Sequence, residues 1–198
     1  MNKQVIKIAQ LTALACFLLV GAIVTAKTGT HLNQNSNSLT TAMVPAKLSV
    51  SDRKFVLEAA MGGMAEVELG RLATQKGTSD AIKTFGQKMV DDHSAANSEL
   101  TTLASAKGIT LPTSLDPKHK AVMNRLARLS GAAFDRAYAR DMLNDHIQDV
   151  AAFKRESRMA RDADVKAFAG SKLPTLEEHL SMARELNNMK TAKTMNHD

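Results

Sequence analysis

The chain is poor in the residues that would fix a fold covalently or break up helices. Its 198 residues include one cysteine, no tryptophan and four prolines. The cysteine, Cys16, lies in an apolar N-terminal run, so a chain that has lost this run can form no disulfide and must be stabilised by packing. Apolar residues recur at helical spacing over most of the remaining chain, which predicts an all-α fold.

Several sequence signatures of chemistry are also missing. We find no Gly-x-Ser-x-Gly elbow, no phosphate-binding loop and no cysteine–histidine pair, so nucleophilic and phosphoryl-transfer catalysis lack support. The formal net charge of +6 is spread along the chain. Since no lysine- and arginine-rich stretch is interleaved with aromatic residues, nucleic acid is not an expected partner.

Residues 1–26 have the features of a secretory signal peptide. Lys3 and Lys7 precede an apolar run from Leu11 to Val24, and the small residues Thr25 and Ala26 follow this run. This run has only about 14 residues, whereas a membrane-spanning helix needs roughly 20. We therefore expect cleavage after Ala26, export to the periplasm or beyond, and no stable membrane span. An uncleaved N-terminal anchor is the alternative.

The remaining chain divides into a polar lead-in, one folded domain and a tail. Residues 27–50 are rich in Ser, Thr, Asn and Gln and lack apolar periodicity, which predicts a flexible linker. We expect the bundle over residues 51–190 and a disordered tail over 191–198. Helix caps and apolar stripes predict helices over 51–76, 80–107, 118–129, 132–161 and 163–188. The last of these contains Pro174, which predicts a kink or a division into two helices.

An internal repeat relates the two halves of this region. Asp91-Asp92-His93 resembles Glu177-Glu178-His179, and Ile82–Phe85 resembles Val165–Phe168 if three residues are inserted near Pro174 in the second half. Two repeated helical hairpins are thus predicted to form a four-helix bundle of the ferritin-like kind, with a short extra helix in the crossover.

Each long helix carries a metal-binding residue type on its apolar face. These candidate ligands are Glu66, His93, His146, Asp149 and His179. If the faces converge, the imidazole and carboxylate groups suit iron, manganese or zinc, and the lack of thiolate argues against a soft-metal site. Separations beyond about 8 Å would exclude a shared site. The alternative is that each histidine is a partly buried residue hydrogen-bonded to a neighbour.

The acidic residues next to the histidines point elsewhere. Asp92, Asp145 and Glu178 each precede a histidine and are therefore rotated about 100 degrees from it on the helix. We expect them to face solvent or to support the ligands from outside. Gly62 and Gly63 lower helix propensity within the first helix, which predicts a close approach of another helix near Glu66.

Four segments resemble a known exported bacterial family. They are Met61–Gly70, Phe85-Gly86 with Met89–His93, Phe134–Tyr138 with Asp145-His146, and Leu173-Pro174 with Glu178–Leu180. Over residues 51–187 the chain resembles domain of unknown function 4142, a family placed among the ferritin-like folds. Ferritin-like di-iron proteins carry a Glu-x-x-His motif on two helices. Here Val90 and Leu176 stand three residues before His93 and His179. A single metal ion held by Glu66 and histidines, or a vestigial site, therefore fits better than a carboxylate-bridged pair.

These observations lead to two functional expectations. The first is an exported ferritin-like bundle that binds a transition metal in its core and serves metal handling or envelope stress protection. The second is a non-catalytic envelope structural or interaction module without metal. We assign no catalytic residue, and an oxidase activity would have to be shown by turnover. A homo-oligomer is compatible with both.

Overall fold

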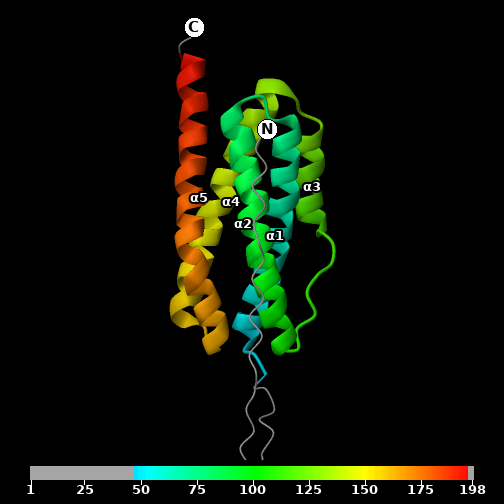
Figure 1. Cartoon of the computed structure of the whole chain (residues 1–198), viewed down its shortest axis with the longest axis vertical. Coiled ribbons are helices and arrows are strands. Elements are labelled where there is room, and N and C mark those ends of the chain that lie inside the picture. The colour runs from blue at the N-terminus through cyan, green and yellow to red at the C-terminus, as the bar shows by residue number, and fades with distance from the viewer. Residues whose placement is uncertain (1–46, 196–198) are drawn as a thin grey trace, which may run out of the picture. The chain divides into compact units, whose positions relative to one another are not determined.

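The structure is a computed structural model that describes the backbone of residues 47–195 and the side chains of residues 47–188. Within these residues it contains five helices and no strand, which confirms the all-α prediction (Figure 1). The helices are α1 (Val50–Lys76), α2 (Asp80–Ala106), α3 (Pro117–Ala127), α4 (Gly131–Met159) and α5 (Ala163–Met195). No helix in the described part is long and apolar enough to cross a membrane. The predicted signal peptide and most of the predicted linker lie outside the described residues.

The helix ends differ from the predicted ones by a few residues. Helix α1 begins at Val50 because the Ser49 hydroxyl accepts a hydrogen bond from the backbone N–H of Asp52 at 3.1 Å. Helix α5 continues to Met195, so the prediction of a disordered tail from residue 191 was wrong for residues 191–195. The chain contains neither glycine nor proline after Pro174 to end this helix.

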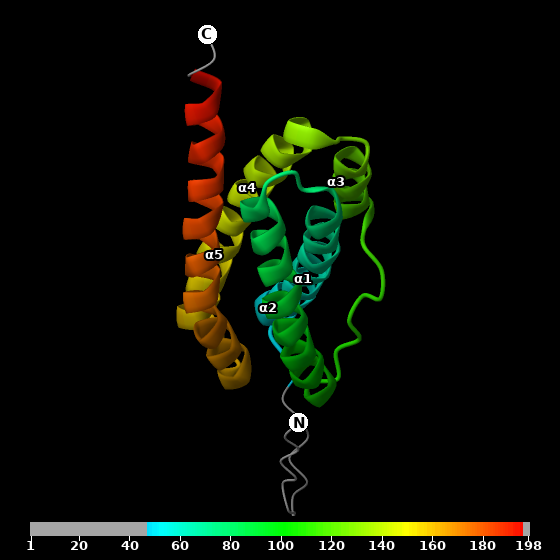
Figure 2. The same cartoon turned by 45° about the horizontal axis from the view of Figure 1, so that its top comes forward.

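Helix α5 is continuous although it contains a proline. Pro174 lies inside it, so the alternative of two separate helices does not hold. Figure 2 shows the first, orange part of α5 running at an angle to the later, red part. A bend is the expected result, because proline removes one backbone hydrogen bond and crowds the preceding turn.

The helices form two hairpins. Helix α1 packs along α2 and α4 packs along α5, while α2–α5 and α1–α4 contacts join the two pairs. The short helix α3 lies in the crossover between the hairpins and contacts both α1 and α4 (Figure 2). This is the predicted arrangement of two repeated hairpins with an extra helix between them.

Two buried aspartates join the hairpins in a reciprocal way. Asp52 in α1 accepts hydrogen bonds from the backbone N–H groups of Arg161 and Asp162, in the connection between α4 and α5, at 3.2 and 2.9 Å. Asp135 in α4 accepts from those of Thr78 and Ser79, in the connection between α1 and α2, at 2.9 and 3.2 Å. Each hairpin thus caps the turn of the other, as a pseudo-twofold relation between repeats requires.

We expect Asp52→Asn to lower the free energy of unfolding at neutral pH by about 1.5–3 kcal/mol, because it removes charged hydrogen bonds to buried backbone groups. Burial raises the pKa of Asp52, but the hydrogen bonds outweigh it and hold the pKa below the ordinary value of 3.8. The contribution of the Asp52 carboxylate to the free energy of unfolding is therefore complete above pH 3.8 and is lost as the pH falls through the lower pKa of the folded state. Urea denaturation at several pH values measures this.

The difference between wild type and Asp52→Asn should shrink on acidification. Glu58→Gln is a suitable control, since Glu58 is exposed and pairs with Lys54 one helical turn away. It should change the free energy of unfolding by no more than about 0.5 kcal/mol. A constant difference down to about pH 2 would contradict the assigned role of the Asp52 carboxylate.

The close contact between α1 and α2 lies at a different glycine from the predicted one. A Cβ atom on Gly70 would lie 2.6 Å from the backbone oxygen of Gly86, and one on Gly86 would lie 2.8 Å from the Cβ of Ala73. A Cβ on Gly62 would meet nothing within 4 Å. The predicted close approach of another helix near Glu66 is therefore found at Gly63, where a Cβ atom would lie 2.2 Å from Asn97 Oδ1 in α2, and is wrong at Gly62. The two backbones meet most closely nearer the end of α1.

Two glycine-to-alanine substitutions in α1 should have opposite effects. Gly70→Ala should lower the free energy of unfolding by about 1–3 kcal/mol, since backbone atoms must move to admit the methyl group. Gly62→Ala should raise it by about 0.5–1 kcal/mol through helix propensity. Denaturant midpoints compare the two, and equal effects would show that the α1–α2 contact at Gly70 is not tight.

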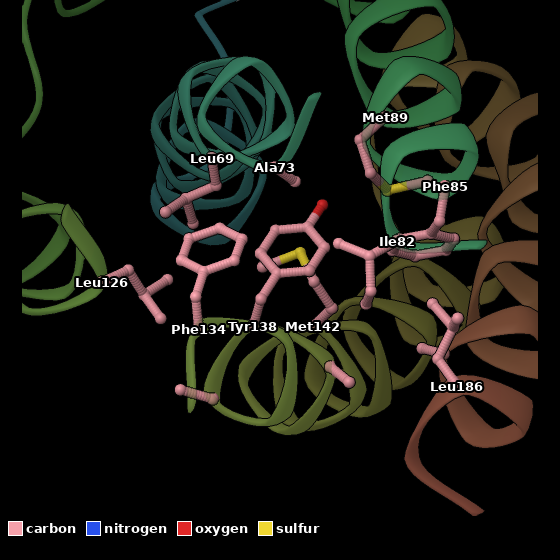
Figure 3. Close-up of a cluster of buried hydrophobic side chains, with 13 residues drawn as sticks. Leu69, Ala73, Ile82, Phe85, Met89, Leu126, Phe134, Tyr138, Met142 and Leu186 are labelled. Carbon is pink, nitrogen blue, oxygen red and sulfur yellow. The ribbon is translucent and has the colours of Figure 1, made fainter. Parts of the chain in front are cut away.

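The apolar core is divided into two clusters. One contains Phe85, Phe134 and Tyr138, and Figure 3 shows its side chains converging from several helices. The other contains Phe55, Phe153 and the residues packed around them. On each long helix the candidate ligand stands between residues of the two clusters, as His93 does between Met89 and Leu100. The polar side chains thus form a layer across the middle of the bundle.

Candidate metal centre

The structure brings the three candidate histidines together. His93 of α2, His146 of α4 and His179 of α5 each place one ring nitrogen within 4.8 Å of those of the others. Their ring centroids are 5.2–5.9 Å apart. All three residues are buried, and His146 and His179 are completely inaccessible. The separations lie well inside the limit of about 8 Å for a shared site.

One nitrogen of each histidine faces a protein oxygen. His93 Nδ1 lies 2.8 Å from Glu66 Oε2, and His179 Nε2 lies 2.7 Å from Asp92 Oδ2. His146 Nδ1 is 2.9 Å from the backbone oxygen of Met142 in the preceding turn. Metal-bound histidines have this arrangement, because a carboxylate or carbonyl that accepts the second ring N–H fixes the tautomer and the ring orientation.

The opposite nitrogen of each ring makes no hydrogen bond. Within the described part of the chain, His93 Nε2, His146 Nε2 and His179 Nδ1 are buried without a hydrogen bond. Glu66 Oε1 is also buried without one, and it lies 3.4 Å from His146 Nε2. Unpartnered buried polar atoms are uncommon and costly. These four atoms lie on α1, α2, α4 and α5, and together they indicate a common missing partner.

Burial keeps the three imidazoles neutral. It is the main cause that lowers the pKa of His93 and of His179, although the Asp92 hydrogen bond partly opposes it at His179. Burial lowers the pKa of His146 to about 3, and the repulsion that protonated His93 would exert acts in the same direction. Neutral imidazole is the form that binds metal, since its second nitrogen carries a free lone pair.

Three carboxyl groups form a second cluster beside the histidines. Glu66, Asp145 and Asp149 each place one oxygen within 4.8 Å of those of the others. Burial raises the pKa of Glu66 and of Asp149 well above their ordinary values, and it also raises that of Asp145. Such a group shares protons in the absence of a cation and ionises when a cation arrives. Glu66 links this cluster to the histidines, because its carboxylate lies 2.8 Å from His93 Nδ1 and 3.4 Å from His146 Nε2.

One of the three neighbouring acids has a different position from the predicted one. Asp145, predicted to lie outside, joins Glu66 and Asp149; its spacing of four residues from Asp149 places both on one helix face and could have revealed this. Asp92 supports His179 from outside, as predicted. Glu178 is exposed, as predicted, and its Oε1 lies 3.2 Å from Lys88 Nζ.

A known family of domains matches most of this bundle. The model of a domain of unknown function, DUF4142, matches residues 37–186. The chain belongs to this family. The match covers every residue of the two clusters. A comparison with curated proteins finds no match.

A solved structure shares the fold of this DUF4142 domain. The crystal structure of a DUF305 fragment from Deinococcus radiodurans superimposes with a TM-score of 0.62 at 14% sequence identity. The similarity covers 72% of this chain and 98% of the fragment. It supports the helical-bundle fold, whereas the wider assignment to the ferritin-like folds stays a prediction.

Proposed function

We propose that this DUF4142 protein is an exported bundle that binds one transition-metal ion through His93, His146 and His179, and serves metal handling or envelope stress protection. The observation that carries the proposal is the arrangement of the three rings. Each ring has one nitrogen oriented by a protein oxygen and the other buried without a partner. A metal ion placed among the free nitrogens would supply the partner that all three lack.

Glu66 is the proposed fourth ligand. Its Oε1 makes no hydrogen bond and lies 3.4 Å from His146 Nε2, while its Oε2 lies 2.8 Å from His93 Nδ1. Three nitrogens and one oxygen suit zinc or iron(II) better than manganese, which prefers more oxygen ligands. Asp145 and Asp149 would then balance the charge of the ion from the adjacent cluster, with Asp149 no longer required as a direct ligand.

Metal analysis of untagged protein, purified from the envelope fraction, tests the proposal. Wild type should contain one ion per chain, and His93→Ala and His179→Ala should contain little. Persistent metal in both variants, or its absence from wild type after incubation with zinc and with iron(II), would contradict it. The alternative is an interaction module whose histidines only orient helices; it predicts that a chelator leaves the melting temperature unchanged.

The support that Asp92 gives to His179 has a measurable consequence. Asp92→Asn should weaken zinc binding by about 10–100-fold, because an amide orients the imidazole less well than a carboxylate does. Asp91→Asn is a matched control, since Asp91 is exposed and contacts Gln87 instead. Competition with a chromophoric chelator measures both affinities. Equal affinities in the two variants would exclude a supporting role for Asp92.

A further inference from the structure

A cavity of about 180 Å³ lies beside the histidine cluster, and metal binding alone does not account for it. One part of its wall is formed by Glu66, His93 and His179. The rest is largely apolar and includes Leu100, Phe153, Phe168 and Leu176. All four long helices contribute to it, so the cavity is a property of the assembled bundle.

Gly62 in α1 keeps this cavity open. Gly62 lines it, and a Cβ atom there would meet nothing within 4 Å. At Gly63 a Cβ atom would lie 2.2 Å from Asn97 Oδ1, so the side-chain amide of Asn97 occupies the space beside this glycine. Any larger residue at position 62 would extend into the open space.

The size and walls of the cavity favour a small aromatic ligand. An apolar cavity of roughly 150 Å³ is large enough to bind benzene. Here the rings of Phe153 and Phe168, with centroids 6.1 Å apart, both line the space. They offer the edge and face contacts that aromatic rings prefer.

The charges around the cavity favour an uncharged ligand. Glu66, Asp92 and Asp149 line it, and the cation among its lining residues, Lys172, is paired with Glu99 at 2.5 Å. The two charges of a bound divalent ion and the charge of Lys172 would together only balance the three carboxylates, so an anionic ligand would gain no net attraction. Burial of a charge without a partner is costly.

We propose that the cavity binds a small, uncharged aromatic molecule whose nitrogen atom coordinates the metal ion held by the histidines. This inference rests on the proposed metal-binding function. Three histidine ligands and Glu66 leave room for a further ligand when the ion becomes five-coordinate or Glu66 is displaced. Because His93 and His179 line the cavity, a molecule inside it lies next to the metal.

Pyridine titrated into cobalt(II)-loaded protein tests the inference, because cobalt reports its ligands through its visible spectrum. We expect a saturable spectral change. Benzene, which has the same shape without the nitrogen, should compete with pyridine and cause no such change alone. Gly62→Leu should retain stoichiometric cobalt but bind pyridine at least about tenfold more weakly, because the new side chain fills the space that the ring would occupy. Gly170→Leu, at an exposed glycine, should behave as wild type.

The outcomes separate the two proposals. If cobalt does not bind, both the metal site and the ligand site are wrong. If cobalt binds but pyridine leaves its spectrum unchanged, only the ligand site is wrong. Equal pyridine affinity in wild type and Gly62→Leu would show that pyridine reaches the metal from elsewhere, which also overturns the cavity as its site.

Discussion

Zinc should stabilise the metal-free protein strongly. An ion that binds only the folded state, present at about 1,000 times its dissociation constant, raises the free energy of unfolding by about 4 kcal/mol. For a domain of this size, this corresponds to an increase in melting temperature of roughly 8–16 °C. The effect should be large because the proposed ligands come from all four long helices, so that unfolding of any of these helices would release the ion. Thermal unfolding with and without zinc measures it.

Histidine variants show whether this stabilisation comes from the proposed site. In His146→Gln the increase in melting temperature on adding zinc should nearly vanish, and comparison of each variant with and without zinc cancels any intrinsic loss of stability. His119→Gln is the control, because His119 lies in α3, outside the histidine cluster, and pairs with Asp116. An undiminished zinc effect in His146→Gln would place the bound ion elsewhere.

Phe85→Ala should produce the largest loss of stability that we expect from a single substitution. Phe85 is buried and packs edge-on against Tyr138, His146 and His179, with ring centroids 6.2, 6.2 and 6.5 Å away. Truncation of a buried phenylalanine costs about 3–5 kcal/mol, because it removes apolar burial and leaves a cavity. Urea denaturation of the metal-free protein measures this loss.

The same substitution should also weaken zinc binding, by about tenfold, because the ring fixes two of the imidazoles. Phe168→Ala is the matched control, since Phe168 is the repeat-related residue and packs against Phe153 in the other core cluster. It should destabilise the protein but leave the zinc affinity near that of wild type. If both variants lose zinc affinity equally, the effect is a general loosening of the bundle and not a property of Phe85.

Much of the architecture could be predicted from residue patterns alone. Helical spacing and caps identify all five helices to within a few residues, except at the end of α5, because helix formation depends mainly on local residues. The repeat of Asp91–His93 in Glu177–His179 predicts the paired hairpins. It also identifies the positions where candidate ligands face inward, since inward-facing positions of repeated helices are equivalent.

Other features depend on contacts between residues far apart in the chain. The close helix contact lies at Gly70 and Gly86, and only the packing of α1 on α2 distinguishes it from the glycine pair at Gly62 and Gly63. Likewise, spacing places Asp145 and Asp149 on one face of α4, but the meeting of that face with Glu66 results from the rotation of α4 against α1. A helical pattern gives the face of each residue but not the rotation of one helix against another.

The sequence by itself therefore determined an all-helical DUF4142 bundle and a short set of polar residues facing its interior. Only the tertiary structure decided which nitrogen of each histidine is held by a protein oxygen and which is left free, and that a cavity adjoins them. The physical reason is that ring orientation depends on hydrogen-bond partners from other helices, and cavity shape depends on how all four helices pack.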